Sequence, residues 1–444
     1  MASGCTRYPT PDICSTGNFV PQINGIRLKD SVSKSCKIQY MENTERHRPQ
    51  QTPPPAHSGP LAWVKLRSAS ASPNLFKRMI DEIDFKARPG DFVAAYDRHG
   101  LAYGVALYNP KSLITLRLFS KDIPGFTPEA VFGKRIEEAV FLRKNVMKLD
   151  ATTDAYRLVH DVGDGLPGLV ADRYGNHIVL EFYSLGMYKN AALLEQIFAK
   201  HFPSAKFSRR ASQYTETMEG FRCDPVKPAK VRIQENEVQF EVEISAGYKT
   251  GFFCDQRENR LIFSKFCNGK KVLDLCSYTG GFGIYAKKRG LADEVTCVEL
   301  DEEAYERMKR NANINGVRIN TVNADAFAYL RQMGMNGVSY DTAVLDPHKL
   351  ISSREGFEEG RRKYLDFNRL GISLVRPGGI FLTCSCSGLL QWPDFVEIVR
   401  SAAMATGRRV QIFRKTGAGP DHPFAVEHPE GEYLKAMWCR VLSS

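Results

Sequence analysis

Residues 272–283 read Val-Leu-Asp-Leu-Cys-Ser-Tyr-Thr-Gly-Gly-Phe-Gly, an apolar stretch that runs into a glycine-rich turn. Such a stretch predicts a buried strand followed by a tight loop. From here on, predicted strands and helices alternate. The strands lie near residues 271–275, 295–299, 320–323, 341–345 and 379–384, and the helices near 281–289, 302–315, 325–333, 360–375 and 392–406. This alternation predicts an α/β fold with a doubly wound, mostly parallel sheet, which binds ligands at the carboxyl ends of its strands.

Three acids end or follow the first three of these strands. They are Asp274, Glu299 and Asp325, spaced by 25 (299 − 274) and 26 (325 − 299) residues. A carboxylate after the second strand suits the two hydroxyls of a ribose. The turn is not G-x-G-x-x-G and carries no Walker lysine, which weakens an NAD or ATP interpretation. S-adenosylmethionine fits better, with Glu299 on the ribose and Asp325 with the Ala326 amide at the adenine edge.

The turn itself is expected to hold the amino-acid end of this cofactor. The candidate residues there are Asp274, Ser277, Thr279, Gly280 and Gly281. Each acid also has a purely structural alternative. Asp325 can cap the helix that it precedes, Glu299 can be a surface carboxylate, and Asp274 can order the turn by accepting backbone hydrogen bonds.

Two later strand ends carry groups that can take part in chemistry. Asp346-Pro347 follows the strand near 341–345, and the strand near 379–384 opens into Thr-Cys-Ser-Cys-Ser-Gly-Leu at residues 383–389. Cys384 and Cys386 lie two apart on an extended segment and therefore point to the same face. On geometry alone either can be a nucleophile, or simply fill the core. A metal site is not expected, because no cluster of His or Cys completes four ligands.

Composition narrows the class of protein. The chain has 444 residues with 61 basic and 50 acidic side chains, so its formal charge of +11 favours an anionic partner, nucleic acid first. The alternative is a solvated basic surface. The 11 cysteines show no C-x-x-C pair, which favours reduced thiols in an intracellular, cytoplasmic setting. No apolar stretch approaches the roughly 20 residues that span a bilayer, and no signal peptide is visible.

The length predicts two to four domains. Residues 1–60 are rich in Ser, Thr, Pro and Asn and predict a disordered tail, either a targeting segment or a misplaced start before Met41. Residues 61–132 contain short predicted strands typical of a small β-barrel. Residues 133–246 predict a central α/β domain that begins with a helix over 133–148. Residues 247–444 hold the predicted parallel sheet.

Several stretches together resemble the PUA-domain large-subunit rRNA cytosine-C5 methyltransferases of the RlmI type. The resemblance spans roughly residues 61–444 and rests on residues 166–175, 247–257, 277–282, 346–347, 385–389, 421–423 and 430–435. It implies an amino-terminal PUA domain that binds RNA, a central α/β domain and a class I, Rossmann-like methyltransferase domain. In place of the family's usual D-P-P, the chain has Asp346-Pro347-His348. In place of P-W in the PUA segment, it has Pro73-Asn74.

The resemblance also implies roles for individual residues. Cys386 aligns with the catalytic nucleophile, which adds to C6 of cytosine so that C5 can take the methyl group. Asp346, with Pro347, would handle the exocyclic amine or N3 of the base. Lys249, Asp255, Gln256 and Arg257 would shape the floor between domains, with Arg257 a candidate contact to RNA or to the cofactor carboxylate.

The expected substrate is large-subunit rRNA, naked or in an assembly intermediate, and a homodimer and no membrane partner are expected. Residues 206–210 and 361–364 are basic clusters that could contact phosphate or form a solvated helix or loop surface. The alternative function is a non-catalytic RNA-binding or ribosome-assembly factor. A methyltransferase acting on an exocyclic nitrogen is disfavoured, because no aromatic residue follows Asp346-Pro347 to stack the base.

Overall fold

The computed structural model describes residues 60–244 and 251–444, and all of them belong to one compact unit of the chain. Except for Pro60, the predicted tail over residues 1–60 lies outside the described residues. Lys249, within the family-like stretch 247–257, lies outside them too.

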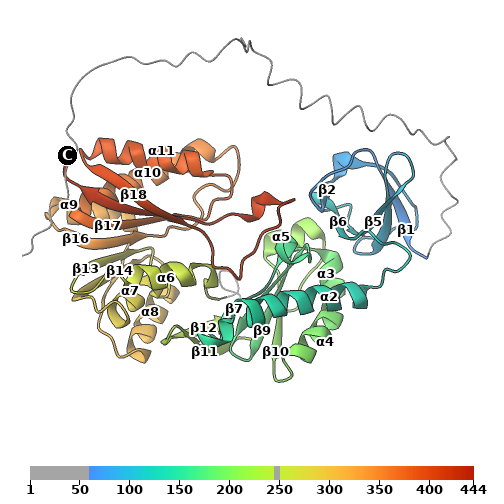
Figure 1. The fold of residues 1–444 in the computed structure, drawn as a ribbon, viewed down its shortest axis with the longest axis horizontal. Helices are drawn as coiled ribbons and strands as arrows, with labels where there is room; N and C mark the ends of the chain where they lie inside the picture. Colours follow the sequence, from blue (N-terminus) through green and yellow to red (C-terminus); the bar gives the residue numbers. More distant parts are fainter. Residues whose placement is uncertain (1–59, 245–250) are drawn as a thin grey trace, which may run out of the picture. The chain divides into compact units, whose positions relative to one another are not determined.

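The largest sheet has seven strands in the order β15-β14-β13-β16-β17-β19-β18 (Figure 1). Its strands are β13 (Lys271–Leu275), β14 (Glu294–Glu299), β15 (Asn320–Asn323), β16 (Tyr340–Leu345), β17 (Val375–Ser385), β18 (Arg409–Thr416) and β19 (Lys435–Leu442). β13 to β17 run parallel, and β19 runs antiparallel between β17 and β18. The chain passes from β13 to β14 and β15 and then returns to the other side of β13 for β16. The doubly wound, mostly parallel sheet is thereby confirmed, with its ligand-binding switch point between β13 and β16.

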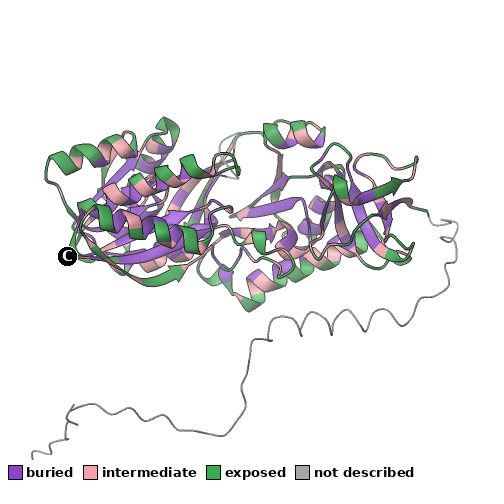
Figure 2. Cartoon of the chain, turned by 90° about the horizontal axis from the view of Figure 1, so that it is seen from above, coloured by how far each residue is buried: buried purple, intermediate pink, exposed green. Residues whose placement is uncertain are grey.

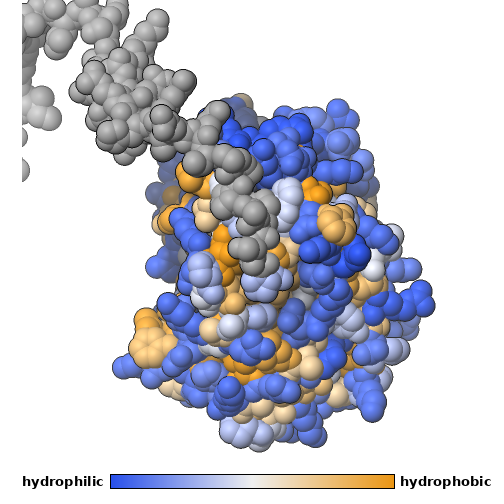
Figure 3. All heavy atoms as spheres, turned by 90° about the vertical axis from the view of Figure 1, so that its right-hand side faces the viewer, coloured by the Kyte–Doolittle hydropathy of each residue, from blue (hydrophilic) through white to orange (hydrophobic). Residues whose placement is uncertain are grey.

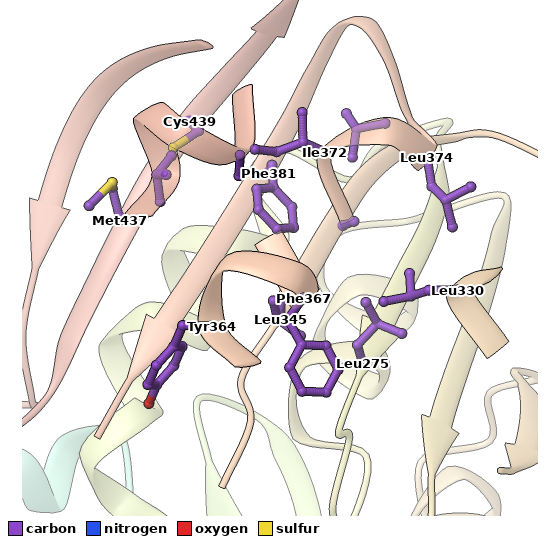
Figure 4. Close-up of a cluster of buried hydrophobic side chains, with 14 of the residues drawn as sticks. Leu275, Leu330, Leu345, Tyr364, Phe367, Ile372, Leu374, Phe381, Met437 and Cys439 are labelled. Carbon is purple, nitrogen blue, oxygen red and sulfur yellow. The ribbon is translucent and has the colours of Figure 1, made fainter. Parts of the chain in front are cut away.

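Helices cover both faces of this sheet (Figure 1). They are α6 (Arg257–Ser264), α7 (Gly281–Lys288), α8 (Glu302–Ile314), α9 (Ala326–Met335), α10 (Phe357–Leu374) and α11 (Trp392–Ala405). On one face, Leu330 of α9 and Tyr364 of α10 pack with Leu345 and Phe381 of the strands (Figure 4). Removing large apolar side chains of this kind from water contributes about 1.5–3 kcal/mol each.

The opposite face of the sheet packs against α6, α7 and α8. Phe263, Phe282 and Met308 from these three helices meet Leu382 and Cys384 of β17. Consecutive residues of β17 thus enter different cores, as the pleat of a strand requires. Figure 2 shows the same division, with buried residues along the strands and exposed residues on the outer sides of the helices.

The amino-terminal described segment forms a six-stranded sheet in the order β2-β6-β5-β4-β1-β3. Its strands are β1 (Ala62–Leu66), β2 (Asn74–Phe76), β3 (Ile80–Ile83), β4 (Phe92–Tyr96), β5 (Ala102–Tyr108) and β6 (Ile114–Ser120). They enclose a small core that includes Val64, Leu75, Val93 and Leu116. Figure 3 views the molecule from the side on which Figure 1 draws these strands, and the surface there is mainly hydrophilic with scattered hydrophobic groups.

The middle of the chain forms a four-stranded sheet in the order β10-β9-β8-β7 and a separate hairpin. The strands are β7 (Ala155–His160), β8 (Leu169–Tyr174), β9 (His177–Phe182), β10 (Lys206–Arg210) and the hairpin β11 (Ala229–Glu235) with β12 (Val238–Ile244). The helices are α2 (Pro128–Phe141), α3 (Leu185–Lys189), α4 (Ala191–His201) and α5 (Gln213–Glu219). Phe132 of α2 and Phe198 of α4 pack on this sheet. The predicted domain limits at residues 61–132, 133–246 and 247–444 stay predictions.

Two predicted elements differ from the structure. The helix expected over 133–148 begins at Pro128, because Thr127 accepts a hydrogen bond from the Ala130 amide and caps it, and residues 142–146 form a π turn. Residues 206–210 form strand β10, not a helix or loop, because they pair in parallel with β9.

Candidate active site

The turn after β13 has an unusual backbone. Cys276 and Tyr278 have φ angles of 57° and 48°, and Gly280 has 84°. Left-handed conformations at residues other than glycine are rare and collect at functional sites. The turn is held by the Ser277 hydroxyl, which donates to Asp274 O at 2.7 Å, and by Asn311, which donates to Thr279 O at 3.0 Å. A rigid loop therefore stands at the switch point of the sheet.

Asp274 lies beneath this turn and is buried. Its Oδ2 accepts the Gly283 amide at 2.8 Å, while its Oδ1 accepts no hydrogen bond from the described residues. Burial, together with the negative charges of Asp346 and Glu299, raises the pKa of Asp274 to about 8, and the Gly283 amide only partly opposes this. A buried carboxyl with a free oxygen suits a positively charged or hydrogen-donating ligand.

Glu299 and Asp325 occupy the next two strand ends. Glu299 Oε2 accepts the Tyr278 amide at 2.6 Å, so this acid is tied directly to the turn. Asp325 caps α9 by accepting the Ala328 amide at 2.9 Å, and Ala326 is the first residue of that helix. The structure thus brings Glu299 to the turn that contains Ser277 and Gly280, while Asp325 plays the capping role that was its structural alternative. Capping leaves Asp325 Oδ2 open to a ligand as well.

Asp346 meets the same edge from β16. Its amide donates to Leu275 O at 3.3 Å, and its Oδ2 accepts from Gln256 Nε2 at 2.9 Å. Asn259 donates to Gln256 Oε1 at 2.6 Å, which fixes which end of the Gln256 amide faces Asp346. Thr416 in turn donates to Asn259 at 2.7 Å. This chain of side chains orients the carboxylate, and Pro347 beside it is buried.

The two serines on either side of Cys386 determine where its thiol points. Ser385 Oγ lies 2.9 Å and Ser387 Oγ 3.1 Å from the hydroxyl of Tyr364 in α10. Both serines are buried, so Cys386 between them faces the opposite way and is partly exposed. Cys384 is fully enclosed, and burial raises its pKa well above the ordinary value for a thiol. Of these two thiols, only Cys386 is open to a substrate.

Cys386 lines a cavity of about 350 Å³. The central segment contributes Arg157, His160 and Glu181 to its walls, and the loop before β19 contributes His428 and Tyr433. The rings of His160 and Tyr433 face each other across 6.1 Å. The cavity therefore combines a thiol with aromatic and polar walls drawn from two parts of the chain.

A buried ion-pair cluster holds the loop that forms one of these walls. Arg257 binds both carboxylate oxygens of Asp421, at 2.8 and 3.2 Å, and Arg143 donates to Asp421 O at 2.7 Å while pairing with Asp164. Arg157 N also donates to Asp421 Oδ2, at 2.9 Å. Burial opposes the charge on Asp421, but His422 and Arg257 outweigh it and hold its pKa well below the ordinary value. Arg257 is 1% exposed and serves this loop, so it offers no guanidinium to RNA or cofactor.

Lys435 brings a positive charge near the thiol. It is the first residue of β19, is 2% exposed, donates to Tyr433 O at 2.8 Å, and interacts electrostatically with Cys386. Burial lowers the pKa of Lys435, while the negative charges of Glu432 and of a Cys386 thiolate oppose that shift. A neighbouring cation favours the thiolate, which is the reactive form of cysteine.

Models of two protein families match parts of the chain. A model of S-adenosylmethionine-dependent methyltransferases matches residues 210–423, and a model of PUA-like domains matches residues 67–121. The ribosomal RNA large subunit methyltransferase I of Vibrio vulnificus strain YJ016 is 35% identical over 399 residues, which cover 87% of this chain and 100% of that protein. The protein of the same name from Photobacterium profundum is 35% identical over 379 residues, which cover 83% of this chain and 95% of that protein.

The chain belongs to the large-subunit rRNA methyltransferase I family.

Membership of this family makes the chain an S-adenosylmethionine-dependent methyltransferase with a PUA-like domain. Solved structures share the fold. A SAM-dependent methyltransferase of Streptococcus mutans superposes with a TM-score of 0.70 at 19% identity and covers 85% of this chain and 99% of that one. SMU.776, described as a methyltransferase and solved with SAH, superposes with a TM-score of 0.69 at 20% identity. The match covers 80% of this chain and 92% of that one.

Two structural findings complete the description of this family member. Within residues 60–244 and 251–444, no helix has the length and apolar character that crossing a bilayer requires. In the same ranges, no three His, Cys, Asp or Glu side chains gather in a way that could hold a metal ion.

Sequence reasoning did not assign roles to several residues of this site. Lys435 and Tyr433 lie in a family-like stretch, but nothing in that stretch shows that β19 pairs with β17 and brings Lys435 to Cys386. His160 and Arg157 come from a strand that was not predicted. The spacing of Ser385 and Ser387 around Cys386 was the one local signal. Side chains alternate along an extended segment, so the two serines point to one face and Cys386 points to the other.

Proposed function

We propose that the chain methylates C5 of a cytosine in large-subunit ribosomal RNA, and that Cys386 forms a transient covalent bond with C6 of that base. The observation that carries this proposal is the position of Cys386, whose thiol opens into a cavity at the carboxyl end of β17 while Cys384 is enclosed. The names of the family members from Vibrio and Photobacterium support large-subunit rRNA as the substrate.

The proposed chemistry needs a nucleophile because C5 of cytosine is itself a poor one. When Cys386 Sγ bonds to C6, electron density moves to C5, which then forms the bond to the incoming methyl group. Loss of the C5 proton and cleavage of the S–C6 bond restore the aromatic ring and the free thiol. Bound S-adenosylmethionine would supply the electrophilic methyl group, and cleavage of its S–CH3 bond would leave S-adenosylhomocysteine.

Three residues would support these steps. Lys435 favours the thiolate of Cys386 before the attack. Asp346 would accept a hydrogen bond from the exocyclic amine, or donate to N3 when protonated, and so stabilise charge on the adduct. Gln256 keeps the Asp346 carboxylate in place through the hydrogen bond at 2.9 Å.

The cofactor assignments are part of the same proposal. Glu299 would hold the ribose hydroxyls, and Asp325 with the Ala326 amide would meet the adenine edge. The turn of Ser277, Thr279, Gly280 and Gly281 would hold the amino-acid end. The free Oδ1 of Asp274 supports this fit, since a buried oxygen without a donor from the described residues suits the ammonium of the cofactor.

The direct test is transfer of a tritiated methyl group to large-subunit rRNA from cells that lack this protein, with mapping of the modified atom. Cys386→Ala should reduce transfer to background while cofactor affinity, measured by calorimetry, stays within about twofold. Cys223→Ala is the matched control, because this partly buried thiol does not line the cavity that contains Cys386. Full activity of Cys386→Ala would exclude the covalent mechanism.

A trapping experiment tests the covalent bond itself. RNA with 5-fluorocytosine at the mapped position cannot lose a proton from C5, so the adduct should accumulate and be found by mass spectrometry on the peptide with Cys386. If RNA binds without any methyl transfer, the chain is instead a non-catalytic RNA-binding or assembly factor. A homodimer stays a separate prediction.

A further inference from the structure

A second cavity adjoins the one that contains Cys386. It has a volume of about 240 Å³ and lies between strands β2 and β6 of the amino-terminal sheet and helix α5. Asp161 and Tyr183 line both cavities, so the two spaces meet at these residues. The second cavity has no part in the proposed methyl transfer, yet it is next to the place where the target base would sit.

Large apolar and aromatic side chains are exposed around this second cavity. Tyr214 is 69% exposed and Leu113 is 65% exposed, and Tyr183 is exposed as well. Scattered exposed apolar residues are ordinary, but several that gather around one hollow mark a binding site. Tyrosine rings are the surfaces on which proteins stack the unpaired bases of single-stranded RNA.

The floor of the second cavity is built to be rigid and uncharged overall. Glu219 pairs with Arg117 at 2.9 Å and also accepts from Asn109 at 2.8 Å and from the Ser112 hydroxyl. Arg117 donates to Tyr183 O at 3.0 Å, which fixes the chain at that residue. Because Arg117 neutralises the buried carboxylate, the cavity does not present an unpaired negative charge to an RNA strand.

Two polar side chains remain for recognition. Asn74 is 7% exposed and lines the cavity, and its Oδ1 accepts no hydrogen bond from the described residues. This oxygen can therefore accept a hydrogen bond from a ligand without giving up an existing hydrogen bond. Asp161 stands where the cavities meet; its Oδ1 accepts the Gly168 amide, and burial raises its pKa.

The two cavities also share a boundary made by distant parts of the chain. Ser72, just before β2, lies 3.3 Å from Nδ1 of His428, and His428 lines the Cys386 cavity. The amino-terminal sheet thus borders both spaces. A strand whose target base enters the first cavity would pass Tyr183 on its way to the second.

We propose that the second cavity binds the base of the nucleotide next to the target in the same RNA strand, stacked on Tyr214. This inference rests on the proposed function, since it takes the Cys386 cavity as the target site. The cavity is smaller than the roughly 300–1,000 Å³ of sites for drug-sized ligands, which suits a single base.

The test uses short RNAs that cover the mapped methylation site, with 2-aminopurine placed on either side of the target. In one of the two positions, binding of the full chain should quench the fluorescence through stacking. Tyr214→Ala should abolish this quenching and weaken RNA binding about tenfold, while Tyr214→Phe should keep both. Phe85→Ala is the matched control, because this ring is exposed but lies outside the cavity.

A second arm separates the cavity from general RNA affinity. With an abasic site at the quenched position, the wild-type chain and Tyr214→Ala should bind equally well. Free nucleoside monophosphates at millimolar concentration should not displace the RNA, since the base is held as part of a strand. Equal RNA affinity of Tyr214→Ala and the wild-type chain on the intact RNA would overturn the proposal, as would displacement by the monophosphates.

The fluorescence readout does not depend on catalysis. Failure of the proposed methyl transfer can therefore be distinguished from failure of the proposed base binding in the second cavity. If the mapped nucleotide is not a cytosine, the chemistry proposed above is wrong, and the same RNAs still test the cavity. If no methyl transfer occurs, the RNA series is built on the segment that ultraviolet crosslinking attaches to the chain.

Discussion

The Cys386 thiol owes its position to its two neighbours more than to any contact of its own. Ser385 and Ser387 both bond to Tyr364, and this leaves Cys386 on the other side of the strand. The sequence predicted that Cys384 and Cys386 share a face, but it could not show that the core closes over Cys384. That distinction depends on Ala436 and Trp438 of β19, which pack with Cys384 from a distant part of the chain.

The charge of Lys435 should govern the reactivity of Cys386. We expect Lys435→Met to slow alkylation of Cys386 by iodoacetamide at pH 7 several-fold and to move the alkylation profile to higher pH, because the thiolate loses a neighbouring cation. The peptide with Cys386 is followed by mass spectrometry. Lys270→Met, at an exposed lysine, is the control and should leave the profile unchanged. An unchanged profile in Lys435→Met would contradict this role.

Asp274 should make cofactor binding release protons. Its pKa of about 8 in the cofactor-free chain means that the carboxyl is mostly protonated at pH 7. A bound sulfonium and ammonium favour the carboxylate, so binding should release up to one proton near pH 7 and almost none above pH 9, where the group is already ionised. Calorimetry in buffers of different ionisation enthalpy measures this. Asp274→Asn should remove the effect, and a binding enthalpy independent of buffer would argue against it.

At the scale of elements, the regular part of the fold was predictable. Strands β13, β14, β15 and β16 were placed to within one residue, because each is short and lies in a regular alternation of strands and helices. β18 and β19 were not predicted. They follow the last helix, break the alternation of strands and helices, and pair antiparallel across an 18-residue connection (residues 417–434), which no local pattern reveals.

The close packing of α7 on β14 depends on Gly283. A Cβ at this position would overlap Cys297 Sγ. Gly283→Ala should therefore push α7 away from the sheet and lower the free energy of unfolding by about 1–3 kcal/mol. Chemical denaturation measures the change, and the cofactor should bind more weakly because Asp274 loses its contact with the Gly283 amide.

Two further variants make this prediction specific. Cys297→Ala in the same chain should recover much of the loss, because it removes the overlapping sulfur. Gly334→Ala in α9 is the control for helix propensity, since a Cβ there meets nothing closer than 4.0 Å, and it should stabilise the chain by about 0.5–1 kcal/mol. Equal effects of Gly283→Ala with and without Cys297 would rule out the overlap as the cause.

At the scale of the whole molecule, the site is assembled from segments far apart in sequence. The proposed cofactor half, from Asp274 to Asp325, follows from the regular order of strands in a single sheet, so the position of these acids at one edge was predictable. The thiol cavity also needs β7, β9 and the loop over residues 421–433. Its walls meet only through long-range contacts such as Arg143 to Asp421, which spacing in the sequence does not reveal.

Asp421 should be the residue on which this assembly depends most. Asp421→Asn leaves the buried Arg257 without its counter-charge, and we expect a loss of about 3–5 kcal/mol in the free energy of unfolding. Urea denaturation at pH 7 measures it. Glu397→Gln breaks an exposed pair with Arg400 and should change the free energy of unfolding far less, because solvent screens that pair. A comparable loss in the free energy of unfolding for both variants would mean that the buried ion pair stabilises the fold no more than the exposed one.

The place of β19 in the sheet has a consequence for how the protein comes into being. β19 is translated after the other eighteen strands described, yet it lies between β17 and β18 and is the partner of β18 in the sheet. Until the ribosome has made residues 435–442, the strand that leads to Cys386 has an open edge, and the thiol lacks its lysine. With Cys386 in the role proposed above, catalytic competence is acquired late in synthesis, and a chain that ends before β19 has the parallel strands of the sheet without the complete thiol site.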